Sequence, residues 1–155
     1  MKGRITTLGA VALASAIGFA TLVTLVQAAD PITDRRDAMK GNGAAMKAIN
    51  TALEAGDSAA DLVPHADKIN DTAMKLATLF PAGSDQPQGK DPGQTMAKPE
   101  IWQNPGDFAA AVKTFQDEAA MFKTAVAGGD MGVIKAEFEK LGGACGNCHK
   151  TFRAK

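Results

Sequence analysis

The chain has 155 residues, with 17 basic and 17 acidic side chains, so its formal net charge at pH 7 is zero. This balance lacks the basic excess that nucleic-acid binding requires, and we expect no nucleic acid among its partners. Ala, Lys and Leu are frequent, Tyr is absent and β-branched stretches are few, which predicts an all-helical protein.

Residues 1–28 have the layout of a secretory signal peptide. Two basic residues precede an apolar run over residues 8–26, and small or aliphatic residues follow at the positions that a signal peptidase recognises. We predict cleavage after Ala28 and export, with no retained membrane anchor. The alternative is an uncleaved anchor, because the run approaches the length that spans a bilayer. Cleavage leaves one domain, residues 29–155, with 15 basic and 17 acidic residues and a net charge of −2.

The first half of this domain predicts two helices and a long loop. One helix covers residues 33–55 and is stopped by Gly56, and the next runs from residue 58 or 59 to Pro81. Apolar residues recur in the second helix at alternating spacings of four and three: Leu62, Ala66, Ile69, Ala73, Leu76 and Phe80. Residues 81–104 contain four prolines and three glycines. A loop of this length in a compact domain is usually functional or mobile.

Two further helices begin at clear signals. Asn104 and Pro105 suit the N-cap and the first helical position of one helix, and Asp130 suits the N-cap of the other. Gly128 and Gly129 separate them, and apolar residues again recur at spacings of four and three. Four amphipathic helices joined mostly by short turns predict an antiparallel up-down-up-down four-helix bundle.

The segment Cys145-Gly146-Asn147-Cys148-His149 has the C-x-x-C-H spacing of covalent haem attachment. Residues i, i+3 and i+4 share one face of a helix, so both sulfurs can reach one porphyrin while the imidazole faces the iron. We therefore predict one haem c, bound covalently through Cys145 and Cys148, with His149 as an iron ligand.

Other interpretations of the two cysteines explain less. A structural zinc site needs four ligands, and only the distant His65 could join Cys145, Cys148 and His149. A thioredoxin-type pair lies at the start of a helix, whereas this pair lies late in one. A plain disulfide is the default in an exported protein but leaves the adjacent His149 unexplained.

The motif lies near the C-terminus, so a second iron ligand must come from another helix. Met39 is our candidate, although a methionine in a helix stripe is more often a core residue. Gly43, one turn later on the same inward face, would leave room for a porphyrin, and Arg35, one turn earlier, could hydrogen-bond a haem propionate. Arg153 and Trp102 are further candidates for a propionate contact or for the pocket.

Over its whole mature length the sequence resembles the class II c-type cytochromes, the cytochrome c prime superfamily. The resemblance rests on residues 35–40, 79–81, 99–102 and 143–153 and on Phe108. It implies a four-helix bundle with haem near one end, located in the periplasm and often a homodimer.

This family has two branches that differ at the second face of the iron. Cytochromes c prime leave the iron five-coordinate and high-spin under an apolar residue and bind NO or CO, whereas the low-spin branch places a methionine on the iron and resembles an electron carrier. Residues 39–43 are more similar to the second branch. We therefore predict electron transfer with redox partner proteins and His149–Met39 ligation, with the NO- or CO-binding type as the alternative. No nucleophile–base pair or phosphate loop is visible, so we expect no enzyme activity.

Overall fold

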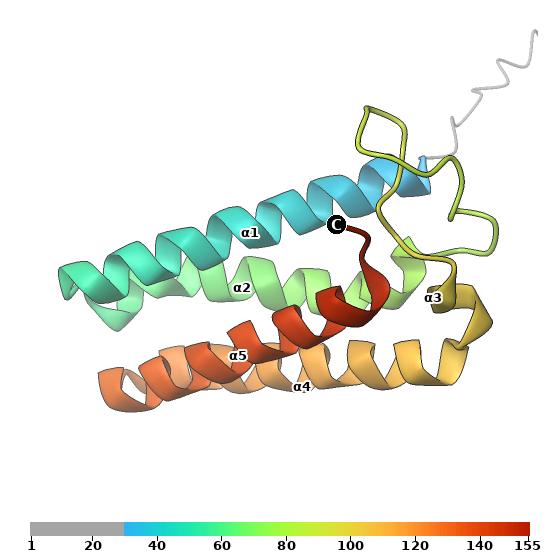
Figure 1. Ribbon diagram of the computed structural model, residues 1–155. Coiled ribbons are helices and arrows are strands. Elements are labelled where there is room, and N and C mark those ends of the chain that lie inside the picture. The colour runs from blue at the N-terminus through green and yellow to red at the C-terminus, as the bar shows by residue number, and fades with distance from the viewer. Residues whose placement is uncertain (1–29) are drawn as a thin grey trace, which may run out of the picture.

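The computed structural model describes residues 30–155, and the predicted signal peptide lies outside them. The described chain forms five α-helices and one 3-10 helix: α1 (Pro31–Ala55), α2 (Ala59–Lys75), η1 (Leu76–Leu79), α3 (Glu100–Gln103), α4 (Pro105–Gly128) and α5 (Met131–Phe152). The four long helices alternate in direction, which confirms the predicted up-down-up-down bundle (Figure 1). None of the described helices combines the length and the apolar character that crossing a membrane would need.

Short polar side chains and glycines set the helix ends. The Asp30 carboxylate accepts hydrogen bonds from two backbone amides in the first turn of α1, and Asp130 does the same for α5. A hydrogen bond from the Thr33 hydroxyl, with further help from backbone amides, holds the pKa of Asp30 below its ordinary value. Gly56 and Gly129 follow α1 and α4 with φ of 78° and 77°, the left-handed conformation that glycine adopts without strain.

The predicted apolar stripes of α2, α4 and α5 supply most of the core. Its largest fully buried apolar side chains are Ile49, Leu62, Ile69, Phe122, Ile134 and Leu141. In α1 the inward face differs from the prediction. Asn42 and Ala45 are buried, whereas Gly43, which the sequence pattern placed on the inward face, is exposed. Part of the inward face of α1 borders a cavity rather than a neighbouring helix.

The four long helices do not pack equally against one another. α4 packs against both α5 and α2, and α2 packs against α1, whereas α1 and α5 make few contacts. The bundle is therefore open between α1 and α5. A cavity there is lined by these two helices, by the long loop between η1 and α3, and by single residues of η1, α3 and α4.

Candidate haem site

A cavity of about 700 Å³ lies at the loop end of the bundle. One wall is α1, with Arg35, Arg36, Met39 and Lys40; the second is the loop, with Gly89, Lys90, Pro92, Gly93, Thr95 and Met96; the third is α5, with Cys148, His149, Phe152 and Arg153. Apolar side chains of Leu76, Phe80, Ile101 and Phe108 complete the lining.

The cysteine–histidine segment forms the last turns of α5. Cys148 and His149 line the cavity, and Cys145, one turn earlier, is half-buried against the core. Both cysteines are free thiols. Burial raises the pKa of each thiol, and the neighbouring Cys148 raises that of Cys145 further. Partial burial and the nearby charge of Arg153 lower the pKa of His149, which favours the neutral imidazole that ligates metals.

The cavity fits a haem in size and in chemistry. Its volume lies within the range of small-molecule sites, about 300–1,000 Å³. Three aromatic rings pack in series on its apolar side: Phe80 lies 4.9 Å from Phe108, and Phe108 lies 5.3 Å from Phe152, between ring centroids. Basic side chains stand on its walls, among them Lys40 and Arg153. An apolar interior with basic groups at its edge suits a flat macrocycle that carries carboxylates.

Arg35 is 3% exposed and binds the long loop. Its guanidinium donates to the Ser84 hydroxyl at 2.7 Å, to the Ser84 carbonyl, to the Thr95 hydroxyl at 2.5 Å and to the Leu79 carbonyl at 3.4 Å. It also lies 5.2 Å from the centroid of the Phe80 ring. These four bonds use most of its donors, so its partners are loop oxygens rather than the propionate that we expected. Burial lowers the pKa of Arg35, and two nearby carboxylates oppose that effect.

Arg36, the next residue, binds the same loop further along. Its guanidinium donates to the Asp91 carbonyl at 2.5 Å, to the Gln94 carbonyl at 2.9 Å and to the Lys90 carbonyl at 3.4 Å. Sequence reasoning did not single out Arg36. Two features of the sequence could have indicated it. A second arginine directly follows a predicted pocket residue, and the loop is longer than a simple connection between helices needs.

The remaining predicted site residues fall in different places. Met39 lines the cavity and packs against the core. Arg153 lines it too, and its Nη2 donates to the Met96 sulfur at 3.6 Å. Trp102 does not line it, and its indole N–H donates to the Pro81 carbonyl at 3.1 Å, which anchors the start of the loop. The structure does not bring Gly43 to the cavity, because Asn42 takes the inward position one residue earlier.

A family model, two curated relatives and a solved structure that resemble this chain share one family name. The family model described as cytochrome c′ matches residues 30–153. The cytochrome c′ of Rhodospirillum rubrum is 32% identical over 146 residues, which cover 92% of this chain and 96% of that protein. That of Rhodopseudomonas palustris is 36% identical over 169 residues, which cover 100% and 99%. A solved cytochrome c′ with ligand-controlled dimer dissociation is 29% identical, with a TM-score of 0.74, and covers 81% of this chain and 95% of that chain.

These matches correct the predicted function. The relatives named above are cytochromes c′, the branch in which the iron keeps one protein ligand, so the prediction of a low-spin electron carrier with His149–Met39 ligation was wrong. The physical reason lies in the adaptability of methionine. Met39 packs against the core as an apolar side chain, and a thioether can fill such a position without bonding to a metal.

The cofactor prediction is confirmed, because members of the matched family carry one covalently attached haem c. The fold, the cavity and the C-x-x-C-H segment agree with that result. The chain belongs to the cytochrome c′ family.

Proposed function

We propose that this protein is an exported, periplasmic haem protein that binds NO or CO at an iron with a single protein ligand. Cys145 and Cys148 hold the haem through two thioether bonds, and His149 is the ligand of its iron. Haem iron with one open position supplies a binding site for small neutral ligands. The role is one of binding rather than catalysis.

The observation that carries the proposal is the one histidine on the walls of an otherwise largely apolar cavity. His149 lines that cavity at the end of α5, whereas the other histidine of the described range, His65, lies on α2 and does not line it. A relative supports the same conclusion. The solved cytochrome c′ that is 29% identical is described as dissociating from its dimer under the control of a ligand, so that protein takes up a ligand.

In this proposal, Met39 is an apolar side chain in the wall of the cavity and does not bind the iron. It is half-buried and packs against the core, as a leucine of similar size would. Met39→Leu should therefore keep the spin state of the ferric protein. A change of spin state in that variant would show that the Met39 sulfur does bond to the iron.

The test is the spin state of the ferric protein together with CO binding by the ferrous protein. We expect a high-spin electron paramagnetic resonance signal at neutral pH, and a CO association rate that rises linearly with CO concentration. A low-spin signal would overturn the proposal. So would an association rate that levels off at high CO, because it would then be limited by the departure of a protein ligand.

We also propose that the protein forms a homodimer. The support is the relative whose dimer dissociates under ligand control. Sedimentation of the ferrous protein with and without CO tests this directly. A single monomeric species at every protein concentration would contradict the dimer.

A further inference from the structure

The loop between η1 and α3 has two parts that are held differently. We call residues 84–88 and 95–98 its base and residues 89–94 its tip. The base is fixed by buried groups: Ser84 and Thr95 are 5% and 1% exposed, and both accept hydrogen bonds from Arg35. Backbone bonds tie the base to the end of α5 as well, from the Lys98 amide to the Phe152 carbonyl at 3.0 Å.

The tip is closed on itself. The Gly89 amide donates to the Thr95 carbonyl and the Thr95 amide donates to the Pro87 carbonyl, each at 3.0 Å, which forms a narrow neck. Within the tip, the Gln94 amide donates to the Asp91 carbonyl at 3.0 Å, and the Asp91 amide donates to the Gln94 side chain at 3.1 Å. The Asp91 carbonyl also accepts a hydrogen bond from an α1 side chain, so the internal bonds of the tip and its contact with the bundle support each other.

The contact between the tip and the bundle depends on one side chain. In the described part of the chain, the bonds from Arg36 are the only hydrogen bonds that join residues 90–94 to α1. Residues 90–93 are all exposed, so the tip buries little apolar surface that would hold it in place. A segment with few buried contacts and an exposed backbone belongs to the least stable part of a structure.

The tip is also a wall of the cavity. Gly89, Lys90, Pro92 and Gly93 line it from the loop, and Arg36 lines it from α1. Moving the tip away from α1 removes this wall while the base, held by Arg35 and by the end of α5, stays in place. The cavity then has a wider opening to solvent.

We propose that Arg36 is a positioning residue that holds the tip of the loop against α1 and thereby limits the access of small ligands to the haem cavity. We call this contact between Arg36 and the tip the latch. The inference rests on the proposed function, because it concerns the entry of the ligand that the haem binds. Arg36 itself does not touch the ligand. It sets the fraction of time for which the tip is open.

Such a role predicts a specific kinetic pattern. A ligand enters and leaves through the same opening, so a larger open fraction raises the association and dissociation rates by the same factor. The equilibrium dissociation constant stays unchanged, because binding itself does not distinguish the open from the closed tip. A residue that contacted the ligand would change the dissociation constant instead.

The experiment measures CO association and dissociation with the ferrous, haem-loaded protein and its Arg36→Ala variant. We expect both rates to rise about tenfold, because the net free energy of one or two hydrogen bonds corresponds to about a tenfold change in the open fraction of the tip. The dissociation constant should change less than about twofold. Amide hydrogen exchange over residues 89–94 should accelerate by a similar factor, and exchange over α4 should not change.

Two further variants separate the latch from an effect of charge or of misfolding. Lys47→Ala removes an exposed positive charge from α1 at a position that does not line the cavity, and it should leave both CO rates unchanged. Gln94→Ala loosens the tip without changing charge, because it removes the acceptor of the Asp91 amide, and it should raise both rates by a smaller factor. Gln94→Ala also preserves the test if Arg36→Ala fails to fold.

The results that overturn the latch differ from those that overturn the proposed function. Unchanged CO rates in Arg36→Ala, or an altered dissociation constant, would overturn the latch while CO binding by the wild-type protein stood. Absence of CO binding by the wild-type ferrous protein would instead overturn the proposed function. Unchanged amide exchange at the tip of Arg36→Ala would overturn the latch even in that case.

Discussion

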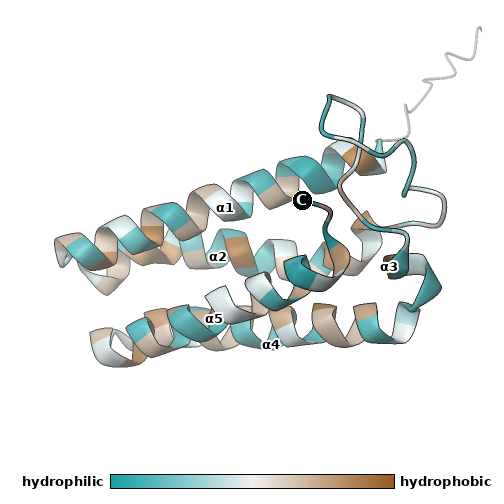
Figure 2. Cartoon of the chain, viewed as in Figure 1, coloured by the Kyte–Doolittle hydropathy of each residue, from teal (hydrophilic) through white to brown (hydrophobic). Residues whose placement is uncertain are grey.

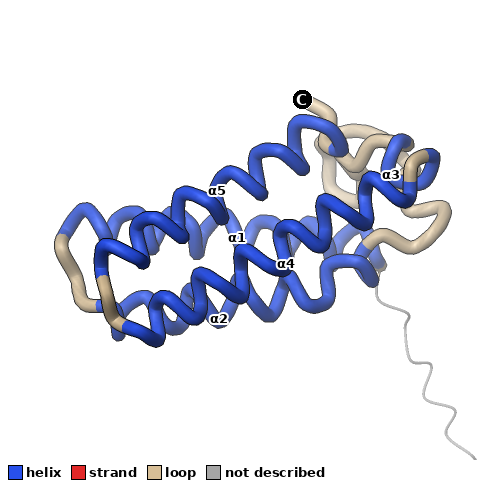
Figure 3. The backbone as a smooth tube through the Cα atoms, turned by 90° about the horizontal axis from the view of Figure 1, so that it is seen from below, coloured by secondary structure: helices blue, strands red, loops and turns tan. Residues whose placement is uncertain are grey.

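The two ends of the bundle are built by different means. At one end, α1 joins α2 and α4 joins α5 through turns of three and two residues; at the other, a loop of twenty residues connects η1 to α3 (Figure 3). The short turns are specified locally, by Gly56 and Gly129 in left-handed conformations and by Asp130 as an N-cap. We call these the turn end and the cavity end.

The cavity end depends on contacts between residues far apart in the sequence. The long loop is largely hydrophilic (Figure 2) and has little apolar surface to bury. Arg35 and Arg36 bind oxygen atoms of residues 79–95 instead, 44 to 60 positions further along the chain. The bundle therefore folds around an apolar core, while the wall of its cavity is held by two guanidinium groups. The core and the loop are thus held by different residues.

The largest effect on stability should come from the core toward the turn end. Phe122 is fully buried and its ring lies 5.8 Å from that of Phe138, between centroids. Phe122→Ala should lower the free energy of unfolding by about 3–5 kcal/mol, because it removes buried apolar surface and leaves a void. Urea unfolding of the haem-loaded protein measures this loss. Met121→Ala, at the exposed neighbouring position, is the control. A loss below about 1 kcal/mol would contradict the core assignment.

A smaller but still large effect is expected from Arg35 at the cavity end. Arg35→Leu keeps an apolar stem but leaves the Ser84 and Thr95 groups buried without their donor, which should cost about 2–4 kcal/mol. Amide exchange should accelerate over both base and tip, unlike the tip-confined change expected for Arg36→Ala. A cost as small as that of a surface substitution would mean that the loop is held by something other than Arg35.

The sequence was sufficient for the parts of the molecule that depend on local signals. The helix boundaries followed from Gly56, Pro105 and Asp130, and the stripes of α2, α4 and α5 followed from the spacing of apolar residues. The proposed haem attachment residues came from one five-residue motif. The contacts of Arg35 could not be predicted, because nothing local shows which loop oxygen a buried guanidinium will meet. The number of protein ligands on the iron could not be derived either. A methionine such as Met39 can serve as an iron ligand or as an apolar side chain in the cavity wall.

Loss of a helix cap at the turn end should have an intermediate effect. Asp130 accepts hydrogen bonds from the Gly132 amide at 2.8 Å and from the Val133 amide at 3.1 Å. Asp130→Ala should lower the free energy of unfolding by about 1 kcal/mol, and Asp130→Asn, which keeps an acceptor, by less. Since α5 ends at the haem motif, far from this cap, the CO rates should not change. Altered CO rates in Asp130→Ala would show that the two ends are coupled after all.

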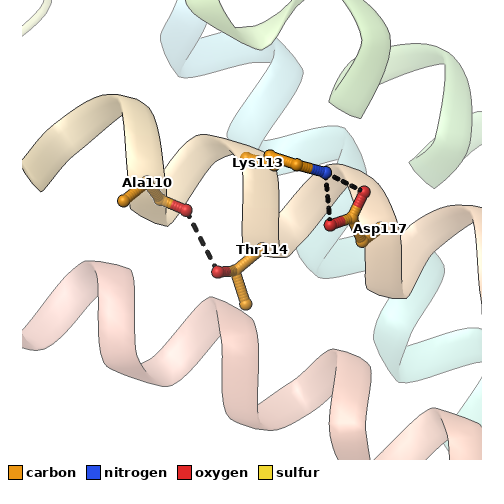
Figure 4. Close-up of polar contacts among 4 residues, drawn as sticks. All are labelled: Ala110, Lys113, Thr114 and Asp117. Carbon is orange, nitrogen blue, oxygen red and sulfur yellow. Dashed lines mark hydrogen bonds and ion pairs between the residues drawn. The ribbon is translucent and has the colours of Figure 1, made fainter. Parts of the chain in front are cut away.

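The smallest effect is expected from a charged pair on the outer face of α4. The Lys113 ammonium lies 2.7 Å from the Asp117 carboxylate, beside the hydrogen bond from Thr114 to the Ala110 carbonyl (Figure 4). Their side chains are 73% and 56% exposed, whereas Arg35 is 3% exposed. Lys113→Ala should therefore change the free energy of unfolding by less than about 0.5 kcal/mol, and about 1 M salt should remove most of that change. A cost near that of Arg35→Leu would mean that burial does not determine how much a cationic side chain contributes to the free energy of unfolding. The contrast between the arginines of the cavity end and ordinary surface charges would then fail.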